Sequence, residues 1–204
     1  MNDNPVVYVV DDDDHARKAV MALVAAMDIE HQGFASAEEF LAAYDGRRPA
    51  CLVTDVRMLG MSGLELQEEL RRRGVGIPVV VLTAFASTQA AVRAMRSGAV
   101  TMLEKPCRDD ELWEAVRDGL TADRQALSAE QSHDEIRHRL STLSAREQDV
   151  LKYITAGDAN KVVARKLGVS VRTVEIHRRA VFQKMGADSL AELVRMVVAV
   201  EDGE

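Results

Sequence analysis

Over the first 120 residues, short apolar runs alternate with longer stretches that are apolar on one side only. The runs are nearly continuous and rich in valine, which is typical of parallel strands buried on both faces. They predict strands at residues 6–10, 51–54, 79–82 and 100–103, and a weaker one at 29–34. The stretches between them have helical periodicity. They predict helices at residues 16–27, 37–44, 64–73, 88–97 and 110–120.

Five strands alternating with five helices indicate an α/β domain over residues 1–122. We predict a doubly wound, five-stranded parallel sheet of the flavodoxin-like type, with strand order 2-1-3-4-5. Ser36 and Glu39 have the spacing of a capping box, which favours a helix that begins at residue 37.

From residue 142 onward the strand pattern is absent and only helical periodicity remains, which predicts helices at 145–156, 161–167, 171–185 and 190–200. Ser144 and Glu147 have the capping-box spacing, and Gly157 and Gly186 follow helix ends. The helices on either side of the turn at 168–170 have helix-turn-helix proportions. We therefore predict a second, smaller all-α domain at residues 142–204.

The segment between these domains, residues 123–141, is polar and contains neither glycine nor proline. This composition predicts a helical linker that continues from the helix at 110–120. A frayed, solvated loop is the alternative.

Composition limits the class of protein. Apolar residues make up 47% and charged residues 29% of the chain, as in ordinary globular proteins. No apolar run approaches the roughly 20 residues that span a bilayer, and the N-terminus lacks the pattern of a signal peptide. We therefore expect a cytoplasmic protein without a membrane partner. Cys51 and Cys107 have no metal-binding or redox spacing and are predicted to be reduced thiols.

The net charge of −7 is unevenly distributed. Residues 1–123 hold 13 Lys/Arg and 21 Asp/Glu, a net charge of −8, whereas residues 145–185 hold nine basic and four acidic residues, a net charge of +5. An acidic first domain and a locally basic second one indicate different partners for the two.

Polar side chains follow four of the predicted strands. They are Asp11 and Asp12 after the first, Asp55 after the third, Thr83 after the fourth, and Glu104 and Lys105 after the fifth. In doubly wound sheets, ligands bind outside the carboxyl ends of the strands where the strand order reverses. These side chains are therefore expected to converge.

Three carboxylates at one edge repel one another unless a cation neutralises them, and Mg²⁺ suits such a site because it accepts few protein ligands. Lys105 adds a positive charge and Thr83 a hydroxyl, so this edge has the chemistry to receive a phosphoryl group. Asp55 has partners on both sides, and we assign it as nucleophile and acceptor. The alternative is that residues 11–14 form only a solvated acidic loop and that Lys105-Pro106 forms only a turn.

These residues resemble the receiver domain of bacterial two-component response regulators. The similarity covers residues 5–121, and four stretches carry it: Val9-Val10-Asp11-Asp12, Thr54-Asp55-Val56-Arg57-Met58 with Ser62-Gly63, Leu82-Thr83-Ala84 and Glu104-Lys105-Pro106.

The resemblance implies phosphotransfer from a sensor histidine kinase to Asp55. It also implies Mg²⁺ held by Asp12, Asp55 and the Arg57 carbonyl, with Asp11 acting through water. Lys105 and Thr83 would contact the phosphoryl oxygens, and the Lys105–Pro106 bond would be cis.

Four positions depart from the family pattern: Leu59, Phe85, Met102 and Cys107. Met102 replaces the aromatic residue that reports phosphorylation in the family. Because methionine is flexible and can fill alternate gaps, we expect the change to pass through Thr83 and Met102 with weaker coupling, or through another side chain. Arg57 and Phe85 would flank the path of a hydrolytic water, and we expect them to prolong the life of the phosphoryl group.

The helix at 171–185 carries many groups that contact phosphates or base edges: Arg172, Thr173, Glu175, Ile176, His177, Arg178, Arg179 and Lys184. A charged, solvated helix face in a small bundle is the alternative. His177 is equally consistent with a partly buried structural role.

Residues 142–200 resemble the LuxR-type output domain, and the match includes Leu143-Ser144, Asn160-Lys161 and Val171 to Arg178. Glu175 points to the FixJ branch of the NarL/FixJ family. The resemblance implies base contacts from Glu175, Ile176 and Arg179. It implies phosphate contacts from Lys161, Arg172, Thr173, Arg178 and Lys184. The partner would be double-stranded promoter DNA.

The resemblance also implies a homodimer on phosphorylation, through residues 88–104 of the first domain. In the second domain we expect the stripe of Leu193, Val197 and Val200 to form the dimer face, and packing within the domain is the alternative. The sequence thus predicts a phosphorylation-controlled transcription regulator and not an enzyme. The alternatives are a DNA binder with a non-switching receiver and an Asp-nucleophile, Mg²⁺-dependent phosphohydrolase.

Overall fold

A computed structural model of the chain describes residues 4–84 and 87–201. Contacts divide the chain into two compact units, Met1–Leu127 and Ser128–Glu204, which we call the N-terminal and C-terminal units. Each predicted strand and helix is present, and the ends differ by one or two residues except at the helix that leaves the first domain.

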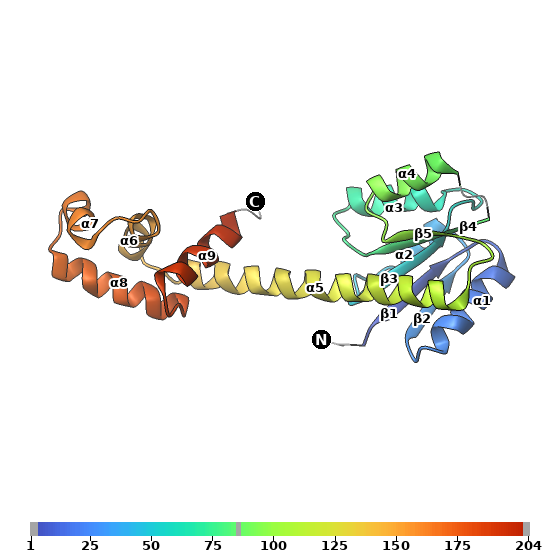
Figure 1. The fold of residues 1–204 in the computed structure, drawn as a ribbon, viewed down its shortest axis with the longest axis horizontal. Helices are drawn as coiled ribbons and strands as arrows, with labels where there is room; N and C mark the ends of the chain where they lie inside the picture. Colours follow the sequence, from blue (N-terminus) through green and yellow to red (C-terminus); the bar gives the residue numbers. More distant parts are fainter. Residues whose placement is uncertain (1–3, 85–86, 202–204) are drawn as a thin grey trace. The chain divides into compact units, whose positions relative to one another are not determined.

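The N-terminal unit is built on a five-stranded parallel sheet (Figure 1). The strand order β2-β1-β3-β4-β5 confirms the predicted 2-1-3-4-5 topology. The strands are β1 (Val6–Val10), β2 (Glu30–Phe34), β3 (Ala50–Asp55), β4 (Val79–Thr83) and β5 (Thr101–Glu104).

Alternating side chains of the central strands enter two separate cores, as the pleat requires. Val6, Tyr8 and Val10 pack with α2 (Ala37–Ala43), α3 (Gly63–Arg72) and α4 (Thr88–Arg96). Val7 and Val9 pack with α1 (Asp14–Ala25) and the first part of α5 (Asp109–Ser141). Figure 1 shows α1 on the opposite side of the sheet from α3 and α4.

Local capping fixes where several helices begin. The Ser36 side chain accepts the N–H of Glu39, but the Glu39 carboxylate accepts the N–H of Ala35 rather than that of Ser36. The predicted capping box at Ser36 is therefore wrong in its second half, because Glu39 reaches one residue further back. The reciprocal boxes occur at Ser62 with Glu65 and, as predicted, at Ser144 with Glu147.

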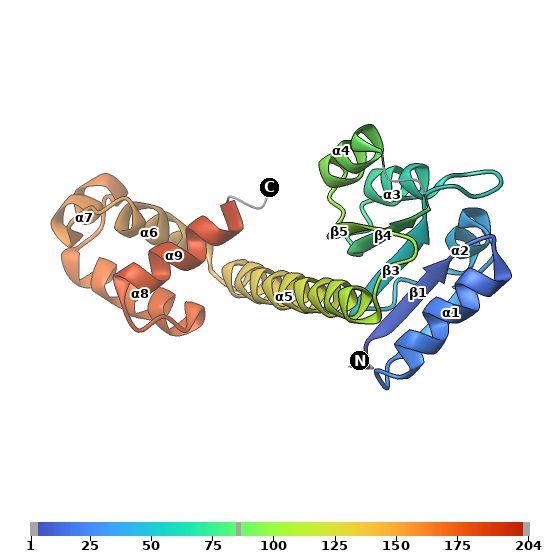
Figure 2. The ribbon, with the colours of Figure 1, turned by 45° about the vertical axis from the view of Figure 1, so that its right-hand side comes forward.

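Helix α5 is a single helix of 33 residues, drawn without a break in Figures 1 and 2. It includes residues 123–141, so the alternative of a frayed loop is wrong. The first part belongs to the N-terminal unit and its last turns to the C-terminal unit.

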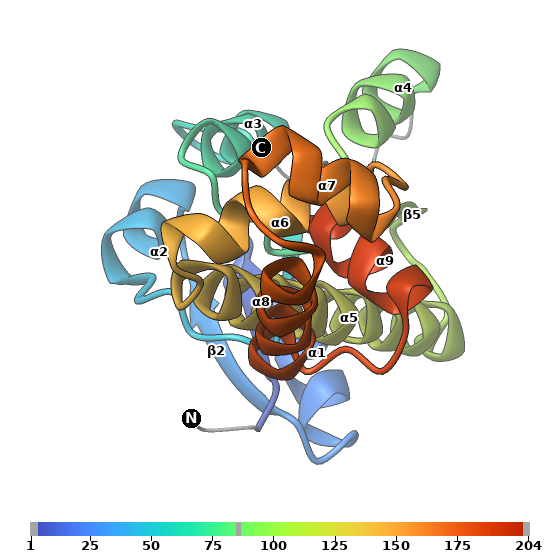
Figure 3. The same cartoon turned by 90° about the vertical axis from the view of Figure 1, so that its left-hand side faces the viewer.

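The C-terminal unit contains the end of α5 together with α6 (Ala145–Thr155), α7 (Asn160–Leu167), α8 (Val171–Met185) and α9 (Leu190–Glu201), seen together in Figure 3. Gly168 and Gly186 end α7 and α8 in the left-handed conformation that favours glycine. Leu193 is fully buried in this unit's core, Val197 packs against that core and Val200 is buried. The prediction that this stripe forms a dimer face is therefore wrong, because these side chains pack within the unit.

Among residues 4–84 and 87–201, no helix combines the length and apolarity needed to cross a membrane.

Candidate functional site

The strand-end residues converge at the carboxyl edge of the sheet. The Lys105 Nζ lies 2.6 Å from Asp11 Oδ2 and 2.9 Å from Asp55 Oδ1. Asp11 and Asp55 are 3% and 8% exposed, and Thr83 is also buried. Residues almost a hundred positions apart therefore form one polar cluster, as their places after the strands predicted.

Lys105 is held in the cluster through its backbone as well as its side chain. Its N–H donates to the Thr83 carbonyl at 2.7 Å, and the Lys105–Pro106 bond is cis, as predicted. Burial alone would lower the Lys105 pKa, but the hydrogen bonds and charges of Asp11 and Asp55 more than offset it and raise that pKa. The lysine therefore supplies a permanent positive charge beside Asp55.

The second oxygen of Asp55 is fixed by its own loop. Asp55 Oδ2 accepts the N–H of Arg57 at 2.8 Å. The loop then returns, and the Gly63 N–H donates to the Val56 carbonyl at 3.2 Å. Asp55 is thus oriented by Lys105 on one side and by backbone on the other.

Asp12 is exposed and lies at the rim of the cluster. Its Oδ2 accepts the N–H of Leu59 at 3.0 Å, while Asp11 Oδ1 accepts the N–H of Asp13 at 2.9 Å. Within residues 4–84 and 87–201, no three ligating side chains are already gathered to hold a metal ion. The donors nevertheless fit Mg²⁺ in kind, since they are carboxylate and carbonyl oxygens on neighbouring loops.

The predicted switch residue Met102 is half-buried on β5. It packs against the core that contains α3 and α4, on the same side of the sheet as Val56, Met58 and Met61 from the loop after Asp55. Phe85, the other departure expected to influence the site, lies outside the described residues.

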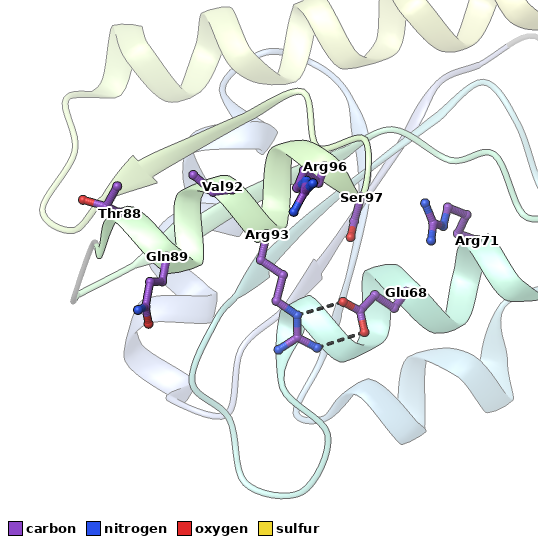
Figure 4. A pocket seen from close by; sticks show the side chains of 8 residues that line it. All are labelled: Glu68, Arg71, Thr88, Gln89, Val92, Arg93, Arg96 and Ser97. Carbon is purple, nitrogen blue, oxygen red and sulfur yellow. Dashed lines mark hydrogen bonds and ion pairs between the residues drawn. The ribbon is translucent and has the colours of Figure 1, made fainter.

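A separate cleft of about 550 Å³ lies between α3 and α4 (Figure 4). Arg93 crosses it to Glu68 through two hydrogen bonds of 2.8 and 2.9 Å. Arg71, Arg93 and Arg96 all lie in the last turns of their helices, where a cation offsets the helix dipole. The positions of these arginines therefore fit a structural role, in which they stabilise the helix ends and Arg93 joins α4 to α3 through Glu68.

In the C-terminal unit, most of the predicted DNA-contacting residues are exposed on α7 and α8. They include Lys161, Arg172, Glu175, Ile176 and Arg179, and Ile176 is 61% exposed. Four of the five line a shallow hollow on α8 together with Gln183, which the sequence pattern did not indicate. One face of α8 therefore presents an apolar side chain together with two arginines and a glutamate.

The other predicted contacts have partners inside the unit. Thr173 Oγ1 lies 2.8 Å from Ser170 Oγ at the start of α8, and Arg178 Nη1 donates to Asn160 Oδ1 at 3.3 Å. Lys184 Nζ forms an ion pair with Glu147 Oε2 at 2.6 Å. His177 is half-buried, which agrees with a partly structural role.

Two family models match the chain. The response regulator receiver domain matches residues 7–117, and the luxR family of bacterial regulatory proteins matches residues 141–197.

Curated relatives match along nearly the whole chain. Nodulation protein W of Bradyrhizobium diazoefficiens is 41% identical over 94% of this chain and 84% of that protein. The transcriptional regulatory protein FixJ of Azorhizobium caulinodans is 42% identical over 94% of this chain and 91% of that protein.

Solved structures agree with this assignment. The response regulator StyR is 38% identical with a TM-score of 0.84, covering 96% of this chain and 98% of its own. Full-length FixJ from B. japonicum is 34% identical with a TM-score of 0.60, covering 98% and 99%. A receiver fold with a carboxylate cluster, followed by a LuxR-type helix-turn-helix unit, places this chain in the NarL/FixJ family of two-component, DNA-binding response regulators.

Proposed function

We propose that Asp55 accepts a phosphoryl group from a phosphohistidine of a sensor histidine kinase. An Asp55 oxygen forms a bond to phosphorus as the phosphorus–nitrogen bond breaks, and the histidine nitrogen keeps the electron pair. The observation that carries this proposal is the Lys105 ammonium 2.9 Å from Asp55 Oδ1, where it can neutralise charge on the transferred group.

Four residues would hold Mg²⁺ in this reaction: Asp12, Asp55, the Arg57 carbonyl and, through water, Asp11. The ion supplies positive charge to the phosphoryl oxygens when it is bound. The carboxylate and carbonyl oxygens at this edge of the sheet support this assignment, because Mg²⁺ prefers oxygen ligands of this kind. Thr83 and Lys105 would contact the same oxygens, and Thr83 and Met102 would pass the change toward α4 and β5.

The phosphorylated receiver would form a homodimer through residues 88–104. Val92 and Met95 support this surface, since both are apolar side chains of α4 and about half exposed. We assign residues 1–122 to the receiver, 123–141 to the linker and 142–204 to the output domain; the first linker residue, Asp123, still packs on the receiver. We place the protein in the bacterial cytoplasm, where kinase and promoter DNA meet.

The output domain would insert α8 into the major groove of promoter DNA. Glu175, Ile176 and Arg179 would reach base edges, with Glu175 accepting from a cytosine amino group. Lys161, Arg172, Thr173, Arg178 and Lys184 would contact phosphates. Lys184 would do so only in exchange for its bond to Glu147.

The test is the affinity for an operator selected from a random duplex pool, measured with and without acetyl phosphate and Mg²⁺. The wild type should bind more tightly after treatment, and Asp55→Asn should not respond, because its side chain cannot accept phosphate. Equal affinity for the treated wild type, the untreated wild type and Asp55→Asn would favour a DNA binder whose receiver does not switch.

We also propose that the chain is not a phosphohydrolase. A hydrolase with an aspartate nucleophile would use a second carboxylate two residues further on as acid and base, and Arg57 occupies that position. Multiple-turnover release of phosphate from a small phosphomonoester would overturn this assignment.

A further inference from the structure

The last turns of the linker helix are bonded to the end of the proposed recognition helix. Arg139 Nη1 on α5 donates to the carbonyl of Met185, the last residue of α8, at 2.8 Å. Nearby, Ile136 and Leu140 of α5 pack against the core of the C-terminal unit. The end of α5 is therefore part of the same packed body as α8.

Arg139 lies where its side chain can cap the C-terminal end of α8. The last carbonyls of a helix have no partner within it, and a cation there is favoured by the helix dipole. Glu135, one turn earlier, accepts from Arg139 Nη2 at 2.6 Å and fixes the guanidinium in place. A Cβ on Gly186 would lie 2.8 Å from Arg139 Nη1, so the guanidinium packs directly against the glycine backbone that ends α8.

A second bond runs in the opposite direction. Lys184 Nζ on α8 donates to the carbonyl of Thr142, just after α5, at 3.2 Å, and pairs with Glu147 on α6. A side chain of α5 thus donates a hydrogen bond to the last carbonyl of α8, and a side chain of α8 donates one to the carbonyl of the residue that follows α5.

We propose that Arg139 is a positioning residue for DNA recognition, which fixes the C-terminal end of α8 to the linker helix. This inference rests on the proposed function of α8 as the DNA-reading helix. The bond joins α8 to the last turns of α5, and both lie in the C-terminal unit. Arg139 itself is expected to touch no DNA.

The test compares Arg139→Gln and Arg139→Lys with Arg137→Gln in the full-length, acetyl-phosphate-treated protein. Arg137 is the matched control, since its side chain pairs with Asp134 on the surface of the same helix. Arg139→Gln should weaken operator affinity about tenfold, which lies within the range found for residues that modulate binding without touching the ligand. Arg139→Lys should recover most of it, and Arg137→Gln should bind like the wild type.

Salt dependence separates positioning from direct contact. Removing a side chain that binds phosphate makes the plot of log affinity against log salt concentration less steep, because fewer counterions are released. Arg172→Gln should have this effect. Arg139→Gln should leave that slope unchanged. Titration to the stoichiometric point gives the folded, active fraction of each preparation.

The result that would overturn the proposal is an unchanged affinity of Arg139→Gln, or a loss explained entirely by its active fraction. A lowered salt slope would also overturn it, because Arg139 would then be a phosphate contact. If Arg172→Gln and Arg179→Ala also bind like the wild type, the assignment of α8 as the reading helix fails; if they weaken binding and Arg139→Gln does not, only the positioning role fails.

Discussion

Arg48 holds the carboxylate of Asp123 inside the N-terminal unit. Arg48 Nε lies 3.0 Å from Asp123 Oδ1 and Nη2 lies 2.6 Å from the same oxygen, while the Ala50 N–H donates to Oδ2 at 2.7 Å. The Asp123 side chain is fully buried. The pair therefore ties α5 to the start of β3, the strand that ends in Asp55.

Removing one partner of this pair should destabilise the N-terminal unit strongly, because a buried charge would lose its partner. We expect Asp123→Ala to lower the free energy of unfolding by ~3–5 kcal/mol. Urea unfolding of the full chain, followed by a probe of the N-terminal unit, measures this value.

The double variant Arg48→Met/Asp123→Leu is the control, because it removes both charges and leaves neither buried without its partner. It should lower the free energy of unfolding less than Asp123→Ala alone. Glu69→Ala removes two ion pairs near the surface, with Arg72 and Arg73, and should lower the free energy of unfolding much less than Asp123→Ala. An Asp123→Ala variant as mild as Glu69→Ala would show that the buried pair does not hold α5 in place.

Gly63 leaves room for the backbone that carries the acceptor. A Cβ at Gly63 would overlap the carbonyl oxygen of Asp55 and lie 2.8 Å from Thr54 Oγ1. Gly63→Ala should therefore push the start of α3 away from β3, costing about 1–3 kcal/mol of stability and slowing phosphate uptake by Asp55. Urea unfolding and labelling with radioactive acetyl phosphate measure the two effects.

Gly76 provides the matched control, since nothing lies within 4 Å of a Cβ built there. Gly76→Ala should leave labelling unchanged and keep or slightly raise stability. Normal labelling of Gly63→Ala would mean that the loop accommodates the methyl group without moving Asp55.

Much of the fold and of the acceptor cluster could be predicted because both depend on local patterns. Valine-rich runs and helical periodicity locate the elements, and parallel strands bring the residues after them to one edge. This reasoning brought Asp11, Asp55 and Lys105 together, and the structure confirms their contact.

Contacts between distant polar residues could not be predicted in the same way. Asp123 lies in a polar stretch that gives no sign of its burial against Arg48, and the predicted linker began at this residue. The stripe containing Leu193 has the same periodicity whether it faces a partner or the core. Lys184 lies on a basic helix, yet Glu147 holds it within the unit.

Arg57 should control how long the phosphoryl group lasts. Its backbone N–H orients Asp55, while its side chain is exposed at the rim of the cluster. We expect Arg57→Asn to speed the loss of phosphate, because a shorter side chain opens the path of a hydrolytic water without removing the N–H bond. The measurement is the decay of radiolabelled protein after the phosphodonor is removed.

Arg57→Lys is the control, since it keeps a long cation at the rim, and it should decay nearly as slowly as the wild type. The same decay rate in all three proteins would remove Arg57 from any role in phosphoryl lifetime.

Glu147 should make the stability of the C-terminal unit depend on pH in the acid range. Hydrogen bonds from Lys184 and the Ser144 N–H lower the Glu147 pKa from its usual 4.5 to about 2. A carboxylate whose pKa is lower in the folded state stabilises that state above the unfolded pKa, and this contribution is lost as the pH falls from about 4.5 to about 2. Glu147→Gln should therefore be less stable than the wild type at pH 7, and the difference should shrink through this window and vanish near pH 2. Thermal unfolding of both proteins across this range tests the prediction, and a difference that stays constant with pH would show that the carboxylate's charge contributes nothing.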